Sequence, residues 1–107
     1  MKVKTYILKG AALDYAVSQI EGVPFSQYAS SRLYFAPSKN WSHGGPIIER
    51  EKIDVAFYKD ECESSVYGTS FVISTGHTPL VAAMRAYVTL KLGDEVEIPS
   101  EIMESMK

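Results

Sequence analysis

Two stretches of the chain show the periodicity of amphipathic helices, and the first runs from Ala11 to Ile20. Its apolar residues stand at positions i, i+3, i+4 and i+7, so they form one stripe made of Leu13, Ala16, Val17 and Ile20. The polar residues between them are expected to face solvent: Asp14, Ser18 and Gln19. Gly22 is well placed just past the helix end, and Pro24 prevents the helix from resuming.

The second helix is predicted to begin after Thr78 and to continue to Leu92. Thr78 is a good N-cap, Pro79 fits the first helical position, and Gly93 follows the end. Its apolar residues cover more than one face, so most of the helix circumference is expected to be buried: Leu80, Val81, Ala83, Met84, Tyr87, Val88 and Leu92.

Strands are predicted where β-branched and aromatic residues alternate or cluster over a short run. The runs are Val3–Leu8, Leu33–Phe35, Asp54–Tyr58, Val66–Ser74 and Asp94–Ile98. A charged turn joins the third run to the fourth, so these two are expected to form a hairpin. Gly68 interrupts the fourth run and is expected to mark a bulge.

The remaining segments complete the expected architecture. A loop over Ser38–Gly45 should lead into a helix of one or two turns from Pro46 to Glu51. The tail, residues 99–107, is expected to form a last helical turn or to fray. Together the elements predict an α+β fold, in which a small antiparallel sheet packs against two helices in a single compact domain over residues 1–107.

Composition narrows the classes of function. The 107 residues are 46% hydrophobic and 22% charged, with a formal net charge of -2. These values favour a globular domain, and the acidic balance argues against nucleic acid as the partner. Cys62 is the only cysteine, and the chain has neither a run long enough for a membrane span nor a signal-peptide core. We therefore expect a cytoplasmic protein without membrane partners.

Three blocks of sequence resemble the NinX-like proteins, a family of small phage and prophage proteins of unknown function. The blocks are GAALDYAV at residues 10–17, YFAPSKNWSHGGPIIERE at residues 34–51 and TPLVAAMRAYVTLKLGDEV at residues 78–96. His43 stands where the resemblance leads us to expect Gln, which weakens any proton-transfer role for it. The resemblance implies a phage accessory protein made in the cytoplasm of the infected cell, and it implies no mechanism.

The first candidate binding site is the segment before Pro46, with the residues Asn40, Trp41, Ser42, His43, Gly44 and Gly45. The glycines would let a ligand approach the backbone, and a helix starting at Pro46 would present N–H groups to an anion. Trp41 would offer a flat face to a base. In the alternative interpretation Trp41 is a core anchor that pins a long loop, and the glycines only turn the chain.

Two further candidates involve groups that bind anions. His77 and Thr78 stand at the start of the second helix, where free N–H groups attract phosphate or carboxylate, and Arg85 lies two turns further on. The alternative is an ordinary helix cap and a surface arginine. Arg50 could meet a ligand phosphate, or it could belong to a solvated or internally paired run with Glu49 and Glu51.

The sequence shows no arrangement typical of catalysis or metal binding, so we expect no enzyme, no metal and no cofactor. We expect a protein that sequesters a nucleotide-derived signal of host immunity, such as a cyclic dinucleotide or an ADP-ribose derivative, as a homo-oligomer. This expectation rests on the residue types of the candidate sites and on an analogy with phage sponge proteins. The alternative is a phage protein that binds and inhibits or redirects a host protein, which would show an exposed apolar patch.

Overall fold

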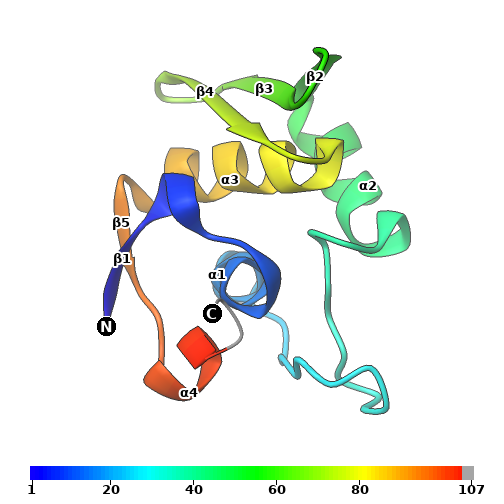
Figure 1. The fold of residues 1–107 in the computed structure, drawn as a ribbon, viewed down its shortest axis with the longest axis vertical. Helices are drawn as coiled ribbons and strands as arrows, with labels where there is room; N and C mark the ends of the chain where they lie inside the picture. The colour runs from blue at the N-terminus through cyan, green and yellow to red at the C-terminus, as the bar shows by residue number, and fades with distance from the viewer. Residues whose placement is uncertain (105–107) are drawn as a thin grey trace.

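Helix α3 (Pro79–Leu92) runs through the middle of the molecule and contacts nearly all the other elements (Figure 1). The computed structural model describes residues 1–104. A three-stranded sheet lies above α3 in this view, and helix α1 (Gly10–Glu21) lies below it. Helix α2 (Trp41–Glu51) packs at one side. As the sequence predicts, α3 is buried around most of its circumference, at Leu80, Ala82, Ala83, Met84, Ala86, Tyr87 and Val88.

The strands within residues 1–104 form two separate antiparallel sheets. The larger sheet has the order β2 (Asp54–Phe57), β3 (Cys62–Tyr67), β4 (Phe71–Gly76). The smaller sheet pairs β1 (Lys2–Lys4) with β5 (Glu95–Glu97). The α+β class and its antiparallel pairing are confirmed, but the expectation of one sheet is wrong because β1 pairs with the strand that follows α3.

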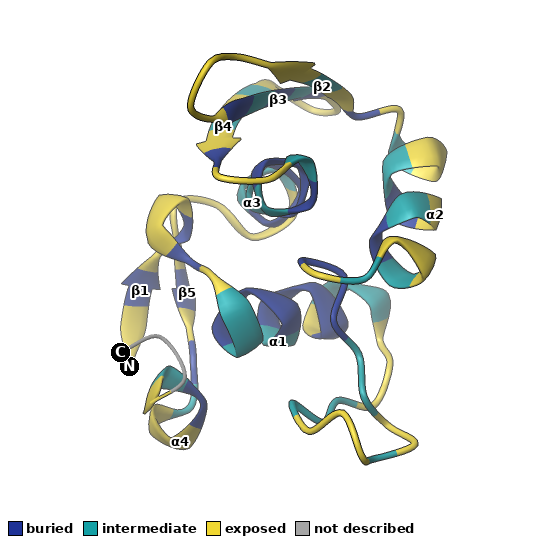
Figure 2. Cartoon of the chain, turned by 45° about the vertical axis from the view of Figure 1, so that its right-hand side comes forward, coloured by how far each residue is buried: buried dark blue, intermediate teal, exposed yellow. Residues whose placement is uncertain are grey.

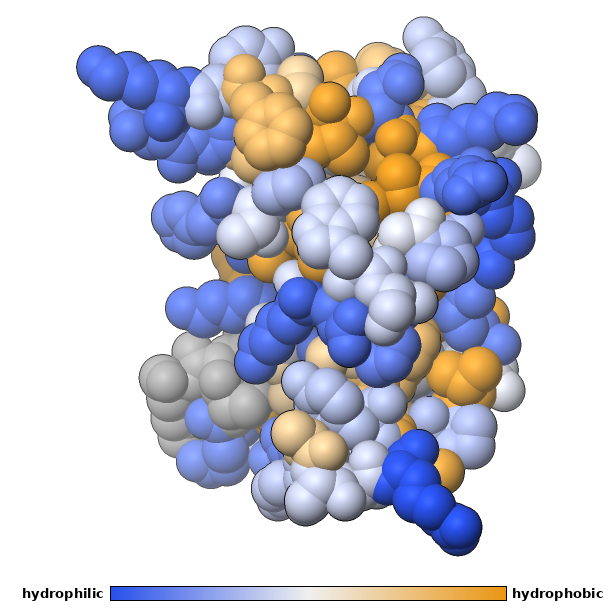
Figure 3. All heavy atoms as spheres, turned by 90° about the vertical axis from the view of Figure 1, so that its right-hand side faces the viewer, coloured by the Kyte–Doolittle hydropathy of each residue, from blue (hydrophilic) through white to orange (hydrophobic). Residues whose placement is uncertain are grey.

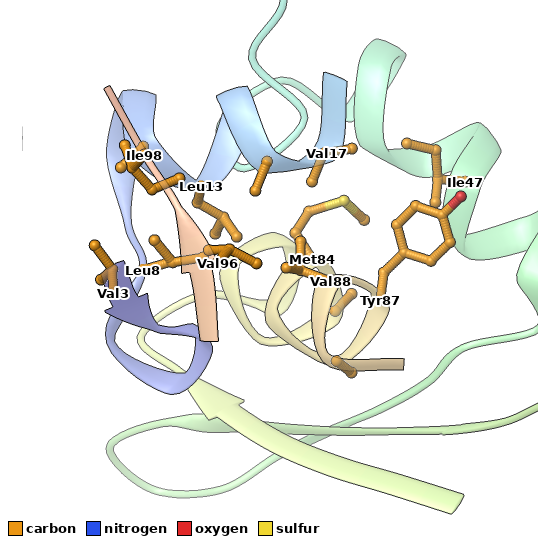
Figure 4. Close-up of a cluster of buried hydrophobic side chains, with 14 of the residues drawn as sticks. Val3, Leu8, Leu13, Val17, Ile47, Met84, Tyr87, Val88, Val96 and Ile98 are labelled. Atoms are coloured by element: carbon orange, nitrogen blue, oxygen red, sulfur yellow. The ribbon is translucent and has the colours of Figure 1, made fainter. Parts of the chain in front are cut away.

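The main core lies between α1 and α3 and extends to the β1–β5 pair (Figure 4). Leu13 and Val17 of α1 face Met84 and Val88 of α3, and all four side chains have no exposed surface. Figure 2 shows the buried residues on the facing sides of these helices, with exposed residues on the outer sheet strands and loops. None of the helices in residues 1–104 is long and apolar enough to cross a membrane.

The expectation that Asp14 and Ser18 face solvent is wrong. Asp14 is 3% exposed and Ser18 is fully buried. The Asp14 carboxylate accepts a hydrogen bond of 2.8 Å from the Ser38 N–H, and the Ser18 hydroxyl donates one of 2.6 Å to the Tyr15 carbonyl. Both side chains are polar yet buried because each has a hydrogen-bond partner, which periodicity alone does not show.

Helix α2 begins five residues earlier than the sequence suggests, so the predicted loop over Ser38–Gly45 is wrong at its second half. Asn40 is the N-cap, and its Oδ1 accepts a hydrogen bond of 2.9 Å from the Ser42 N–H. Pro46 lies inside the helix, where its missing N–H leaves the Ser42 carbonyl without its usual partner. The cap therefore decides where the helix begins, against the local preference of the glycines and the proline.

Three other segments differ from their predictions. Residues 5–7 form a 3-10 helix, η1 (Thr5–Ile7), and the Leu33–Phe35 run makes an isolated bridge, between Tyr34 and Ser26, in place of a strand. The Val66–Ser74 run is divided between β3 and β4, so Gly68 lies in a turn and not at a bulge. The predicted helical turn of the tail is present as helix α4 (Ser100–Met103), and residues 105–107 lie outside the described part of the chain.

Candidate functional site

The start of α2 and the start of α3 meet at the surface and enclose a shallow hollow of about 380 Å³, here called the Trp41 hollow. Its lining is mainly apolar and includes one lysine and two hydroxyl residues. It is lined by Ser38, Lys39, Trp41, Thr78, Pro79, Leu80 and Val81. Two of the candidate sites expected from the sequence are therefore parts of one surface, although they are far apart along the chain.

Trp41 lies on the surface. The residue is 55% exposed, so the interpretation of Trp41 as a core anchor is wrong. A Cβ built on Gly45 would be 3.6 Å from Trp41 Cε3, which shows that the indole lies along the helix over Gly45. The indole therefore contacts α2 near Gly45, with part of its surface open to solvent.

A second hollow, of about 440 Å³, adjoins the first across Thr78 and Pro79. The tip of the β2–β3 hairpin and the residues before α3 line it: Phe57, Tyr58, Lys59, Asp60, Glu61, Cys62 and His77. Phe57 is 74% exposed and Tyr58 is 60% exposed. Figure 3 shows hydrophobic side chains gathered in the upper part of the α2 side of the molecule, with hydrophilic side chains at its borders.

The starts of α2 and α3 leave fewer N–H groups free for an anion than expected, because the N-cap residues of both helices already accept hydrogen bonds from them. In α3 the Thr78 side chain accepts from the Val81 N–H and the Thr78 carbonyl accepts from the Ala82 N–H, at 3.2 and 3.0 Å. Pro79 has no N–H, so the Leu80 N–H is the free donor of this first turn among the described residues. Asn40 caps α2 in the same way. A negative ligand group would therefore rely mainly on Lys39 and on the helix dipoles.

Two hydrogen bonds, one buried and one partly buried, hold the segment between Phe35 and Asn40 against the helices. Asp14 accepts from the Ser38 N–H, and Nδ1 of His43 accepts a hydrogen bond of 3.0 Å from the Ala36 N–H. Burial raises the pKa of Asp14 from 3.8 to about 6, against the opposing effects of the Ser38 amide and hydroxyl and of Lys39. The Ser38 hydroxyl is buried nearby but completes no hydrogen bond with any residue in the range 1–104. Asp14 and His43 therefore position one wall of the Trp41 hollow and do not line it.

Arg50, expected as a candidate anion ligand, is held by other residues of the chain. Its Nη1 and Nη2 donate to the two carboxylate oxygens of Glu21 at 3.0 and 2.7 Å, and its Nε donates to Glu51 at 2.8 Å. The Tyr87 hydroxyl donates to Glu21 at 2.5 Å and accepts from Arg50 at 2.9 Å. The internally paired alternative is therefore the one observed, and we leave Arg50 out of the proposed site.

The Arg50 cluster is expected to stabilise the fold through paired charge. The guanidinium of Arg50 lowers the pKa of the Glu21 carboxyl, which is 16% exposed. We expect Glu21→Gln to reduce the free energy of unfolding by about 1–2 kcal/mol at pH 7. The expected loss is kept small because Arg50 is half-exposed and solvent weakens its interaction with Glu21. Since the pKa of Glu21 is lower in the folded state than its ordinary value of 4.5, the stabilisation by its ion pair should be present above pH 4.5 and disappear as the pH falls below it. Urea unfolding at pH 7 and pH 3 measures both.

Two variants test that interpretation of the cluster. Arg50→Lys keeps the charge but cannot make the paired hydrogen bonds, so we expect it to lose most of the same stability. Glu49→Gln, on an exposed residue of the same helix, should change little. Equal losses from the Glu21 and Glu49 variants would show that net charge and not the paired geometry matters.

Arg85 also has a structural position away from the hollow. Its Nε donates to the Leu8 carbonyl at 2.7 Å and its Nη1 to the Thr75 carbonyl at 2.8 Å. Burial lowers the pKa of its guanidinium. Arg85 thus joins the end of β4 to the chain before α1, and we leave it out of the proposed site.

The structure thus divides the expected site residues into three groups. The two hollows are lined by Trp41, Thr78 and His77. The start of α2 is formed by Asn40, Ser42, His43, Gly44 and Gly45. The two arginines, Arg50 and Arg85, lie elsewhere. The sequence reasoning missed Lys39, Phe57, Tyr58 and Lys59. The aromatic pair next to a charged turn was the available signal for the last three. In residues 1–104 no group of three or more His, Cys, Asp or Glu is placed to hold a metal ion.

The fold and the two adjoining hollows define a small α+β protein with an aromatic, open surface site. Residues 5–91 match the family model described as Bacteriophage P22, NinX. The chain therefore belongs to this phage NinX family. No curated protein matches the sequence.

Proposed function

We propose that this phage protein binds a small nucleotide-derived signal of host immunity in the Trp41 hollow and sequesters it without chemical change. What supports the proposal is the convergence of the starts of α2 and α3 on one hollow that offers an exposed indole, a mainly apolar lining and a cation. A nucleotide needs these three features: a flat face for its base, an apolar surface beneath it and a positive group for its phosphate. A homo-oligomer would close the hollow from its open side.

A screen of the purified protein tests this proposal. The probes are cyclic dinucleotides, cyclic and linear ADP-ribose derivatives and NAD. Binding of each probe is measured by the shift in unfolding temperature and by the fluorescence of Trp41, the only tryptophan. A rise in unfolding temperature with recovery of intact ligand is the expected result, since a ligand of the native state stabilises it. Recovery of altered ligand would mean that the protein is an enzyme.

We expect Trp41→Ala to weaken binding of the ligand by about 5- to 150-fold, because stacking of one base on an aromatic ring contributes about 1–3 kcal/mol. Trp41→Phe keeps a ring and should retain most of the affinity. Tyr28→Ala removes another exposed aromatic residue, 66% exposed and outside both hollows, and serves as the matched control. Equal affinity of the Trp41→Ala and Tyr28→Ala proteins for the ligand would show that the ligand binds outside the Trp41 hollow.

A second candidate function is binding to a host protein in order to inhibit or redirect it. The observation that favours it is the number of large apolar side chains on the surface, among them Phe57, Tyr58, Tyr67, Phe71 and Ile73, each at least 48% exposed. If no probe shifts the unfolding temperature, this candidate becomes the better one.

A further inference from the structure

Strand β4 is an edge strand of the larger sheet, and the edge that faces away from β3 is open. Arg85 donates to the Thr75 carbonyl from that side at 2.8 Å. Main-chain groups of alternate residues point to the same edge of an antiparallel strand, so those of Phe71 and Ile73 share the edge with Thr75. Within residues 1–104 no other strand pairs with this edge.

A trough runs along the open edge, here called the β4 trough. One part, of about 530 Å³, lies between β4 and the end of α3 and is lined by Ser70–Ile73, Thr89, Leu90, Gly93 and Asp94. A second part, of about 340 Å³, continues from Ile73 and Ser74 to η1 and is lined by Lys4, Thr5 and Tyr6. Ile73, Thr89 and Asp94 line both parts, so the trough follows the direction of the strand. Its shape suits an extended segment of polypeptide.

The exposed edge lacks the features that usually protect edge strands from pairing. Strand β4, with the sequence FVISTG, contains no charged residue and no proline. Phe71 is 48% exposed and Ile73 is 55% exposed. Strand β2, at the opposite edge of the sheet, is shorter and begins with Asp54. The open edge of β4 is therefore the better template for an added strand.

The charge in the trough indicates the chemistry of the segment that it would bind. Asp94 is exposed and lines both parts of the trough, and within residues 1–104 its carboxylate makes no ion pair. The neighbouring Lys4 pairs with Glu95 at 3.3 Å, so it does not neutralise Asp94. A lysine or arginine of the bound segment would do so. The β4 strand of a second copy has no basic residue, which disfavours self-pairing through this edge.

We propose that the β4 trough binds an extended segment of another protein, which adds to the sheet as a fourth strand and places a basic side chain against Asp94. Main-chain hydrogen bonds to Phe71 and Ile73 would supply affinity, and Asp94 would select the basic residue. The interaction uses a different surface from the Trp41 hollow.

A titration of the ¹⁵N-labelled full-length protein tests the proposal. The probe is a synthetic hexapeptide of alternating valine and threonine with one terminal arginine, and its matched control has glutamate in place of arginine. We expect saturable amide shifts at Phe71, Ile73, Thr89 and Asp94, with at least fivefold weaker binding of the glutamate peptide. Asp94→Asn should remove the difference between the two peptides, and this exposed residue can be changed without loss of the fold.

Three results would overturn the proposal. One is the absence of shifts at millimolar peptide, and another is equal binding of a peptide whose alternate amides are N-methylated and cannot pair with the edge. The third is a dimer in sedimentation experiments without peptide, with concentration-dependent protection of the Ile73 amide, because a second copy would then occupy the edge. None of these readouts depends on Trp41, so failure here is distinguishable from failure of the nucleotide-binding proposal.

Discussion

Gly44→Ala is expected to destabilise the protein by about 2–3 kcal/mol, the upper part of the range of about 1–3 kcal/mol in which an added methyl group disturbs a packed interior. Gly44 lies inside α2 and is buried, and a Cβ at this position would overlap the Pro37 carbonyl oxygen and lie 2.7 Å from Leu80 Cδ2. The carbonyl belongs to the backbone and cannot rotate away as a side chain can. The helix must therefore move away from the segment before it and from the start of α3.

Gly45→Ala is the matched control for this experiment, because it makes the same change one residue further along the same helix. A Cβ there would make ordinary contact with Trp41 Cε3 at 3.6 Å. Alanine is the better helix former, so this variant should be more stable by about 0.5–1 kcal/mol. Urea unfolding followed by Trp41 fluorescence measures both variants. Similar stabilities would show that the contact between Gly44 and Pro37 does not constrain the helix.

Asp14→Asn is expected to remove a large part of the dependence of stability on pH between about 4 and 6. The folded pKa of Asp14 is about 6 because the carboxyl is buried, and its ordinary value is 3.8. The folded state therefore takes up a proton that the unfolded state does not hold in this window, so the contribution of Asp14 to stability grows as the pH falls from 6 to 3.8. A difference of about two pH units corresponds to about 3 kcal/mol.

At pH 7.5 the Asp14→Asn protein should be at least as stable as the parent, because burial penalises a neutral amide less than an ionised carboxylate. Its oxygen can still accept from the Ser38 N–H, and its NH₂ group can donate to the Ser38 hydroxyl, which has no partner among the described residues. Urea unfolding of both proteins from pH 4 to pH 7.5 gives the difference, with Asp60→Asn as an exposed control. If Asp14→Asn markedly lowered the stability at pH 7.5 but left it unchanged at pH 4, the ionised carboxylate would be needed to stabilise the fold.

The helices α1 and α3 were predictable because local signals and burial agree there. Gly22 in left-handed conformation, with φ of 67°, ends α1, and Thr78 caps α3 through its side chain. The start of α2 was missed because two glycines and a proline resemble a loop, whereas the Asn40 cap and the contact with Pro37 stabilise a helix. The 3-10 helix at Thr5–Ile7 was missed for a similar reason, since its alternating residues resemble a strand.

The candidate site was predictable only in its parts. Trp41 and Thr78 could be selected by residue type, but their shared hollow depends on how α2 packs against α3. The pairing of Arg50 with Glu21 joins residues that are 29 positions apart, so neither local charge pattern nor spacing indicates it. Arg85 likewise bonds to the Leu8 carbonyl 77 positions away.

The sequence by itself determined the α+β class, the two long helices with their caps, the burial of α3 and the resemblance to phage proteins that the family match confirms. These depend on periodicity and on contacts within a few residues. The tertiary structure alone decided that Asp14 is buried, that Trp41 is exposed and that β4 has an open edge. Each of these depends on which distant segment packs against a residue, and a local pattern carries no information about that partner.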